Sequence, residues 1–271
     1  MELLKFYKEL YKQRSPPRIH LVEGLLPKIT REQANPLEKR PTVDEINKAL
    51  DDCDGSKAPN YDGFNFIKEM WQDFGGEVST FILKFFDTGK LPNEINHTWV
   101  TLIPKVDGAI DIKDFRPISM IGSIYKIIAK ILAKRIANVL PELISETQSA
   151  FVKNRQILDG ALIANEVVWC LKKTRQKAAI LKLDFQKAYD TVQWDFLEET
   201  LVGMGFGRKW IIWIMECVRT ASMSILVNGS PTSSFHLQIG LRQGDPLSPF
   251  LFLLVAEILV GLSAEEKILV S

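Results

Sequence analysis

The sequence predicts an α+β fold, because segments with helical periodicity and short strand-like runs alternate along the chain. The clearest helix covers residues 123–140, where apolar residues recur every three or four positions until Pro141. Residues 99–103 and 179–185 are rich in β-branched or alternating apolar residues, which predicts strands. Hydrophobic residues make up 46% of the 271 residues, so the chain can bury a substantial core.

The remaining elements follow from local signals in chain order. Residues 1–41 are punctuated by prolines and are interpreted as an irregular lead-in. A capping-box pattern at Thr42 predicts the start of a helix. Further helices are predicted at 64–74, 78–86, 163–173, 194–204, 210–220 and from Ser248 onward, and further strands at 223–227 and 235–239.

The net charge of +1 means that affinity for phosphate would depend on local clusters of basic residues. Lys126, Lys130 and Lys134 recur every fourth residue on the outer face of the helix at 123–140. Like charges at this spacing cost about 0.2–0.5 kcal/mol per pair, which an external phosphate backbone would relieve. On charge spacing alone the pattern favours an ordinary solvated lysine face, and a nucleic-acid-binding face is the alternative.

Cysteine spacing and hydropathy exclude some classes of protein. Cys53, Cys170 and Cys217 are far apart and show no metal-ligand spacing, so we expect reduced, mostly buried thiols. The most apolar stretch, 250–262, is interrupted by Glu257 and is shorter than the roughly 20 residues that span a membrane. We therefore expect no association with a membrane.

Asp184 is the first candidate for chemistry. Alternation in the strand at 179–185 places Leu183 and Phe185 on one face and Asp184 on the other, near the strand end. A carboxylate supplies the hard oxygen ligands that divalent ions such as Mg²⁺ bind. The alternative is an aspartate that caps the following turn.

Two runs carry a resemblance to a known family. They are Leu183-Asp184-Phe185-Gln186-Lys187-Ala188-Tyr189-Asp190-Thr191-Val192-Gln193-Trp194 and Gly240-Leu241-Arg242-Gln243-Gly244-Asp245-Pro246. Both resemble motifs of the reverse transcriptases of non-LTR (LINE-type) retrotransposons, especially those common in plants. Blocks at 101–105, 115–119 and 148–155 agree in order and spacing, and the resemblance covers roughly residues 42–257.

The resemblance implies a polymerase right hand, with fingers plus the first part of a palm, an incomplete palm sheet and no thumb. Residues 42–160 would form the fingers-like region and residues 161–271 the partial palm, after the lead-in at 1–41. The implied activity is RNA-directed DNA synthesis on an RNA template and a DNA primer, from deoxynucleoside triphosphates. The family also leads us to expect a nuclear or cytoplasmic protein, and no obligate protein partner can be deduced.

The resemblance also implies roles for single residues. Asp184 and the backbone carbonyl of Phe185 would bind Mg²⁺, or Mn²⁺, in a complete enzyme. Tyr189 would exclude a 2′-hydroxyl from beneath the sugar, although a core tyrosine is the alternative. The residues implied to contact the nucleotide are Lys105, Arg116, Phe185, Lys187, Ala188, Tyr189, Gln243 and Gly244, and Arg242 is a weaker candidate for a phosphate contact.

The chain departs from the family pattern in two places. Residues 59–63 read Pro-Asn-Tyr-Asp-Gly where the family usually has Pro-Gly-Pro-Asp-Gly, and no aromatic-x-Asp-Asp motif follows Gly244. With one catalytic carboxylate, the truncated chain is expected to be inactive and to expose apolar surface, including residues 250–262. The alternatives are a non-catalytic nucleic-acid-binding remnant and part of a longer active polyprotein.

Overall fold

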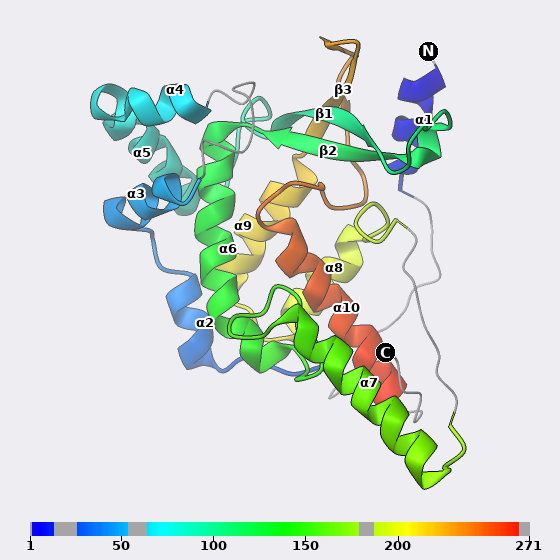
Figure 1. The fold of residues 1–271 in the computed structure, drawn as a ribbon. Helices are drawn as coiled ribbons and strands as arrows, with labels where there is room; N and C mark the ends of the chain where they lie inside the picture. The colour runs from blue at the N-terminus through cyan, green and yellow to red at the C-terminus, as the bar shows by residue number, and fades with distance from the viewer. Residues whose placement is uncertain (1, 14–25, 54–63, 179–186, 266–271) are drawn as a thin grey trace.

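The computed structural model of the protein describes residues 2–13, 26–53, 64–178 and 187–265, which form helices and one mixed sheet (Figure 1). The predicted mixture of helices and strands is therefore confirmed. The helices are α1 (Glu2–Leu10), α2 (Arg31–Leu37), α3 (Val43–Asp51), α4 (Phe64–Glu69), α5 (Trp71–Thr88), η1 (Ile112–Asp114), α6 (Ser123–Leu143), α7 (Ile157–Thr174), α8 (Trp194–Gly203), α9 (Arg208–Arg219) and α10 (Ser248–Glu265). The strands are β1 (His97–Pro104), β2 (Phe115–Ile121), β3 (Ser222–Val227), β4 (Ser230–Pro231) and β5 (Phe235–His236).

The sheet is organised around β1, which runs antiparallel to β2 and parallel to β3. β3 in turn pairs antiparallel with both β4 and β5. Asn228 and Gly229 join β3 to β4 with positive φ angles of 50° and 79°, as a two-residue type I′ turn requires. The sheet thus joins a segment near residue 100 to one near residue 225.

Most predicted elements are confirmed, with shifted ends. Thr42 caps α3 as predicted, because its hydroxyl oxygen accepts a hydrogen bond from the amide of Glu45 at 3.2 Å. Pro141 does not end α6, which continues to Leu143. Burial of Leu140 and Leu143 compensates for the one hydrogen bond that the proline removes. The predicted strand at 179–185 lies outside the described residues.

The main hydrophobic core surrounds α6, which crosses the centre of the molecule (Figure 1). Helices α2, α3, α5 and α10 pack against α6, so its apolar residues are buried on several sides. Ile127, Ile128, Ile131 and Leu132 are completely inaccessible to solvent. This helix is the scaffold on which the other helices are placed.

A second apolar cluster joins α1 to the sheet. Tyr7 and Tyr11 are buried against Val100 of β1 and against Met223 and Ile225 of β3. The prediction of an irregular lead-in at 1–41 is therefore wrong for α1 and α2. The prolines predict an irregular segment. Residues 2–10 nevertheless have an amphipathic pattern, and the sheet covers the apolar face of the helix that they form.

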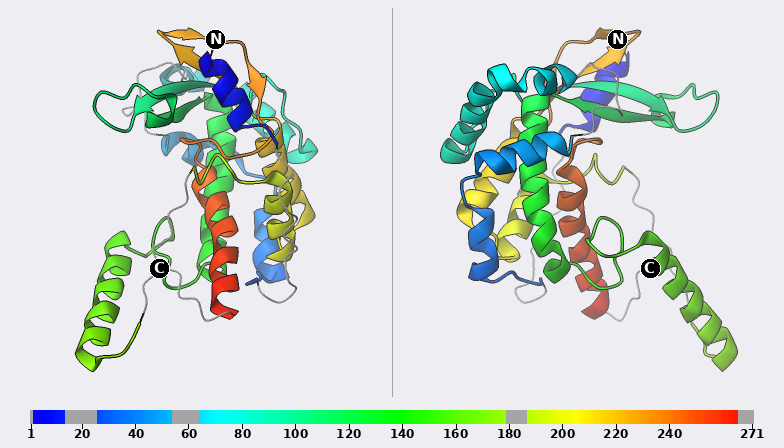
Figure 2. Two further views of the ribbon diagram at one scale, coloured as in Figure 1. Left: turned by 90° about the vertical axis from the view of Figure 1, so that its right-hand side faces the viewer. Right: turned by 60° about the vertical axis from the view of Figure 1, so that its left-hand side comes forward.

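Helix α7 projects away from the rest of the structure (Figure 2). None of its residues is buried, and it exposes six large apolar side chains, those of Ile157, Leu158, Leu162, Ile163, Val167 and Trp169. The prediction that residues 250–262 are exposed is wrong for the first part of that segment. Leu251, Leu253 and Leu254 are buried because α10 packs against α6 and α8.

The remaining expectations concern the thiols and the membrane. Cys53 and Cys217 are buried as predicted, whereas Cys170 lies exposed on α7. Among the described residues, no helix combines the length and the apolar character that a transmembrane segment needs.

Candidate functional site

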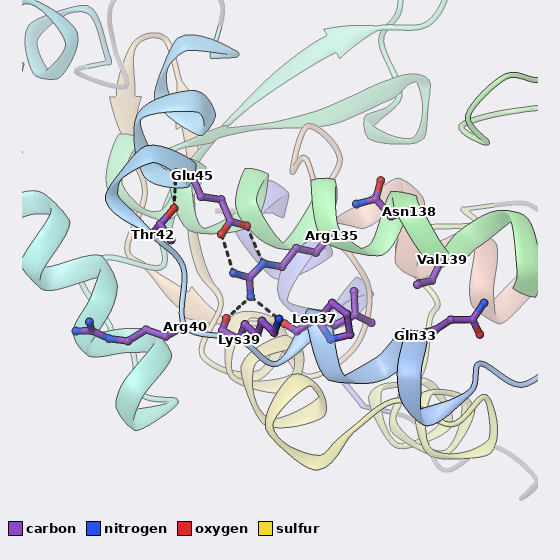
Figure 3. Close-up of a pocket in the computed structure, with 10 residues that line it drawn as sticks. Gln33, Leu37, Lys39, Arg40, Thr42, Glu45, Arg135, Asn138 and Val139 are labelled. Carbon is purple, nitrogen blue, oxygen red and sulfur yellow. Dashed lines mark hydrogen bonds and ion pairs between the residues drawn. The ribbon is translucent and has the colours of Figure 1, made fainter.

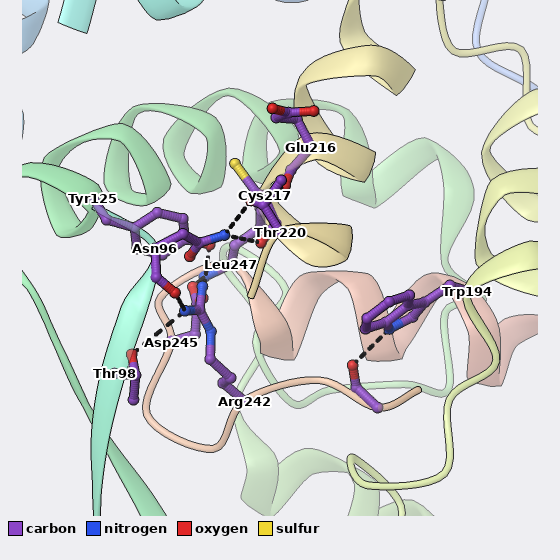
Figure 4. Close-up of polar contacts among 11 residues, drawn as sticks. Asn96, Thr98, Tyr125, Trp194, Glu216, Cys217, Thr220, Arg242, Asp245 and Leu247 are labelled. Carbon is purple, nitrogen blue, oxygen red and sulfur yellow. Dashed lines mark hydrogen bonds and ion pairs between the residues drawn. The ribbon is translucent and has the colours of Figure 1, made fainter. Parts of the chain in front are cut away.

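Two loops that are about fifty residues apart in sequence lie against each other: the first loop covers residues 187–193 and the second covers residues 240–245. The amide of Leu241 donates a hydrogen bond of 2.7 Å to the carbonyl of Tyr189, and the amide of Gly240 donates one of 2.8 Å to the carbonyl of Val192. The indole Nε1 of Trp194 adds a third bond, of 2.9 Å, to the carbonyl of Gly240 (Figure 4). The structure therefore brings together the two runs that the sequence singled out.

Gly240 and Gly244 allow this close packing. Gly240 has φ +86°, and a Cβ there would lie 2.8 Å from the carbonyl oxygen of Asp190. Gly244 has φ +101°, and a Cβ would lie 2.9 Å from the carbonyl oxygen of Ser119 on β2. Both positions therefore require glycine. The group that approaches Gly244 closely in this structure is the backbone of β2 at Ser119.

The carboxylate of Asp190 connects the two loops from the inside. Its Oδ1 atom accepts hydrogen bonds from the Tyr11 hydroxyl at 2.8 Å and from Nε2 of Gln243 at 3.3 Å. Burial raises the pKa of Asp190, and these two donors and the charges of Lys187 and Lys105 oppose that shift. Sequence reasoning missed Asp190 and Tyr11 as parts of the site. The only available signal was the second aspartate of the run 184–190.

Lys187 and Ala188 form a tight turn at the edge of the site. Lys187 has a positive φ of 56°, and its carbonyl accepts hydrogen bonds from the Asp190 amide at 2.9 Å and from the Thr191 hydroxyl at 3.2 Å. The Lys187 ammonium lies 5.2 Å from the centre of the Phe6 ring on α1. Helix α1 therefore contacts this turn directly.

Tyr189 follows in the same turn and is partly buried. Its ring stacks on Phe252 of α10 with centroids 5.2 Å apart and an interplanar angle of 26°. Burial raises the pKa of its hydroxyl. One face of the ring thus packs on the main core, and the assignment of Tyr189 to sugar selection stays a prediction.

Lys105 and Arg116 lie at the distal end of the β1–β2 pair. The ammonium of Lys105 donates a hydrogen bond of 2.7 Å to the carbonyl of Lys113, and its charge opposes the raised pKa of Asp190. Arg116 is exposed on β2, opposite Ile103 in the strand register. Of these two cations, only Lys105 is shown to act on the charge of Asp190, and contact of either one with a phosphate stays a prediction.

Arg242 has a different role from the predicted phosphate contact. Its guanidinium is buried and donates hydrogen bonds to Asp245 Oδ2 at 2.9 Å and to the carbonyl of Asn96 at 3.2 Å (Figure 4). It also lies 4.4 Å from the centre of the Tyr125 ring. The phosphate prediction is corrected, because a paired, buried guanidinium has no donor facing solvent here. Arg242 instead ties the second loop to β1 and α6.

Two of the three lysines on α6, Lys130 and Lys134, face another helix. Lys130 and Lys134 donate hydrogen bonds to the carbonyls of Asp52 and Lys48 at the C-terminal end of α3, and Lys134 also pairs with the Asp52 carboxylate. All three lysines, Lys126 included, are partly buried. Carbonyls at a helix C-terminus attract cations, so α3 supplies the anionic partner expected from outside. Nucleic-acid binding by these lysines stays a prediction.

A pocket of about 450 Å³ lies between α2, α3 and α6, away from the two loops (Figure 3). The guanidinium of Arg135 forms part of its wall and is paired with both carboxylate oxygens of Glu45 at 2.7 and 2.8 Å. Its remaining donor binds the carbonyls of Leu37 and Lys39. The charge of Arg135 is therefore neutralised by Glu45, and its guanidinium is not free to bind a ligand in the pocket.

The predicted metal ligands, Asp184 and the carbonyl of Phe185, lie outside the described residues. Among the residues that the structure does describe, no group of three His, Cys, Asp or Glu side chains could hold a metal ion. The nearby carboxylate of Asp190 is already engaged by Tyr11 and Gln243. The described part of the site therefore does not itself complete a metal site.

Residues 103–270 match the protein family described as reverse transcriptase (RNA-dependent DNA polymerase). This segment contains both loops of the site. Members of that family generally use divalent metal ions and act on a nucleic-acid template and primer with nucleotide substrates.

Individual relatives come from mobile elements. A Xenopus laevis protein named "Transposon TX1 uncharacterized 149 kDa protein" is 30% identical over 256 residues, which cover 93% of this chain and 20% of the relative. The Pol polyprotein of the type-1 retrotransposable element R2 from Popillia japonica is 28% identical over 191 residues, covering 66% of this chain and 27% of the relative. A Drosophila melanogaster Pol polyprotein from element R2DM is 29% identical over 172 residues, 64% of this chain and 16% of its own length. The matched part of the chain thus spans about a sixth to a quarter of the length of these relatives.

Proposed function

Because this chain belongs to the reverse transcriptase family, as a domain of the kind found in non-LTR retrotransposon Pol proteins, we propose that it forms the nucleotide-selecting part of an RNA-directed DNA polymerase. The observation that carries this proposal is the contact between the turn at 187–190 and the loop at 240–244. Both loops belong to the segment that matches the family. Backbone hydrogen bonds join them, and Gln243 of the second loop donates a hydrogen bond to the buried carboxylate of Asp190 in the first.

In this proposal the site binds a deoxynucleoside triphosphate opposite an RNA template and next to the end of a DNA primer. The backbone amides of Lys187 and Ala188 meet the triphosphate, because N–H groups in a tight turn bind anions. Lys105 and Arg116 neutralise its outer phosphates. Phe185 belongs to the same contact set but lies outside the described residues.

Two further contacts select the nucleotide. Tyr189 lies beneath the sugar and excludes a 2′-hydroxyl by steric contact. Gln243 and Gly244 lie under the base pair, where the carboxamide of Gln243 is oriented by its bond to Asp190. We propose the right-hand arrangement for the whole region, with fingers at 42–160 and the first part of a palm at 161–271.

Asp184 and the carbonyl of Phe185 would hold Mg²⁺, or Mn²⁺, as hard oxygen ligands. Two such ions would stabilise the entering and leaving oxygens of phosphoryl transfer when bound. In this proposal the residues named above bind, orient and select the nucleotide, and the ions would serve the transfer step.

A non-catalytic remnant that binds nucleic acid through Lys126, Lys130 and Lys134 is less well supported. Lys134 already pairs with the Asp52 carboxylate, and Lys130 already donates a hydrogen bond to the carbonyl of Asp52. The polymerase-domain proposal needs no rearrangement of that helix pair.

Nucleotide binding tests the proposal on the chain itself. A fluorescent deoxynucleoside triphosphate is titrated into residues 1–271 with Mn²⁺ and an RNA template annealed to a DNA primer, and anisotropy is measured. Lys105→Ala and Arg116→Ala should each weaken binding by about tenfold, the scale of one charge-assisted hydrogen bond. Lys173→Ala, on the projecting helix α7, is the matched control and should leave affinity unchanged. An equal loss of nucleotide affinity in all three variants would contradict the proposal, and so would the absence of nucleotide binding by the unaltered chain.

Primer extension tests the catalytic part. The isolated chain should extend the primer no more than its Asp184→Ala variant, because its sequence supplies no aromatic-x-Asp-Asp motif after Gly244. In a polymerase that contains this domain together with such a motif, Tyr189→Val should raise ribonucleotide use relative to deoxynucleotide use. An unchanged ratio in an active enzyme would leave Tyr189 as a core residue.

A further inference from the structure

The carboxylate of Asp190 is the meeting point of three segments that are distant in sequence. Tyr11 follows α1, Asp190 ends the turn that begins at Lys187, and Gln243 belongs to the second loop. Both Tyr11 and Gln243 donate their hydrogen bonds to the same oxygen, Oδ1, at 2.8 and 3.3 Å. Only 4% of the Asp190 surface is exposed, so water contributes little to these contacts.

Tyr11 is itself held in place by the backbone. Its carbonyl accepts a hydrogen bond of 2.9 Å from the amide of Gln238, and the Gln238 side chain accepts one of 3.0 Å from the amide of Gln13. Tyr11 thus contacts residues on both sides of the site through its backbone and its hydroxyl.

The hydroxyl is well suited to this task. Burial and the charge of Asp190 raise the pKa of Tyr11 well above its usual value, so the hydroxyl keeps its proton and remains a donor. A buried carboxylate needs such donors, because leaving it without them is unfavourable. Tyr7 is equally buried and lies one helical turn earlier, but among the described contacts its hydroxyl forms no hydrogen bond with Asp190.

We propose that Tyr11 is a positioning residue for the nucleotide site: its hydroxyl holds Asp190 and thereby fixes the turn at 187–190 against Gln243. The inference rests on the proposed function, because this turn carries the proposed contacts to the triphosphate and the sugar. Tyr11 acts through Asp190 and does not contact the nucleotide. Helix α1 is thus part of the site, although it precedes the segment that matches the family.

The test compares Tyr11→Phe with Tyr7→Phe in the full chain, since both remove one buried hydroxyl from neighbouring turns. Backbone amide hydrogen exchange is measured without any ligand. Tyr11→Phe should accelerate exchange at least about tenfold at 187–194 and 238–245, the effect of one charge-assisted hydrogen bond. Tyr7→Phe should not. No acceleration would overturn the inference, and so would acceleration that spreads equally through α6 and α9.

Two further variants test the carboxylate. Asp190→Asn keeps an oxygen that accepts a hydrogen bond from Tyr11, whereas Asp190→Leu does not. Exchange in the two loops should stay close to that of the unaltered chain in the first variant and become fast in the second. Equally fast exchange in both variants would contradict a role for the hydrogen bond.

Binding of the fluorescent deoxynucleotide, with Mn²⁺ and the RNA–DNA duplex, separates this inference from the proposed function. Tyr11→Phe should weaken binding at least threefold, and Tyr7→Phe should leave it unchanged. Unchanged binding in Tyr11→Phe, with binding by the unaltered chain intact, would overturn the role in the nucleotide site. If the unaltered chain binds no nucleotide while Tyr11→Phe still loosens the two loops, the proposed function fails and the positioning of the turn stands.

Discussion

Arg242 and Asp245 form an ion pair of 2.9 Å in which both side chains are almost completely buried, with 3% and 4% of their surfaces exposed. Asp245 also accepts a hydrogen bond of 2.9 Å from the hydroxyl of Tyr125, which burial keeps protonated by raising its pKa. The pair therefore fixes the loop at 240–245 to α6, and through the carbonyl of Asn96 to the start of β1.

Removing Arg242 should destabilise the protein strongly. Arg242→Ala leaves the Asp245 carboxylate buried without its cation, which typically costs about 3–5 kcal/mol. Urea unfolding followed by circular dichroism gives the free energy. The double variant Arg242→Ala/Asp245→Ala should recover part of the loss, because no charge then remains unpaired. A loss below about 1 kcal/mol in the single variant would show that the carboxylate finds other partners.

Gly244→Ala should destabilise the protein, because the added methyl group would clash with the backbone of β2 at Ser119. Gly108 also has a positive φ, of +72°, but a Cβ there would meet nothing within 4 Å. Both substitutions carry the strain of a positive φ, whereas only Gly244→Ala adds a clash with the Ser119 carbonyl. Gly244→Ala should therefore lower the free energy of unfolding by about 1–3 kcal/mol more than Gly108→Ala. Similar losses, measured by urea unfolding of the two variants, would argue against close packing of the loop on β2.

Stability should depend on pH through Asp190. Burial raises its pKa in the folded state above the ordinary value of about 3.9, so the folded protein binds this proton more tightly than the unfolded chain. The stability contribution is full below the unfolded pKa and is lost as the pH rises through the folded pKa. Asp190→Asn removes the titration. Relative to this variant, the unaltered protein should lose stability as the pH rises through that window. A relative gain would indicate a lowered pKa instead.

The exposed apolar surface of α7 should make the protein self-associate. Six large apolar side chains of α7 are exposed, and large exposed apolar patches favour association. Replacing Leu158 and Leu162 with lysine should shift sedimentation towards the monomer without lowering the unfolding midpoint, since neither side chain is buried. Val202→Lys, at an isolated exposed residue of α8, is the control and should change neither quantity. A monomeric unaltered protein at the same concentration would refute this expectation.

The sequence predicted elements whose signals are local. The apolar periodicity of α6, the threonine cap of α3 and the β-branched residues of β1 are each readable within about twenty residues. Gly244 was predicted to contact the nucleotide, which stays a prediction, and the close approach that the structure shows there is to the protein backbone on β2. Its neighbour, Ser119, could not be predicted from the run itself.

Contacts between distant segments could not be predicted in this way. The bond between Tyr11 and Asp190 joins residues 179 positions apart, and no local pattern marks either partner. The same limit explains the lysines of α6, whose spacing indicates one face of a helix but does not show that α3 ends there. Arg242 is similar, because a cation in a loop is usually exposed, and only the fold shows that it is buried.

The position of α1 on the sheet has a consequence for how the chain is made on the ribosome. Helix α1 is synthesised before its partners: Val100 of β1 follows about 90 residues later, and Asp190 and β3 follow about 180 to 215 residues later. At translation rates of about 5–20 residues per second, its apolar face waits roughly 10–40 s for Asp190 and β3. During that interval Tyr7 and Tyr11 are available to chaperones. Complete docking of α1 therefore needs segments that are synthesised much later, and the site that it supports forms only after Gln243 has been synthesised.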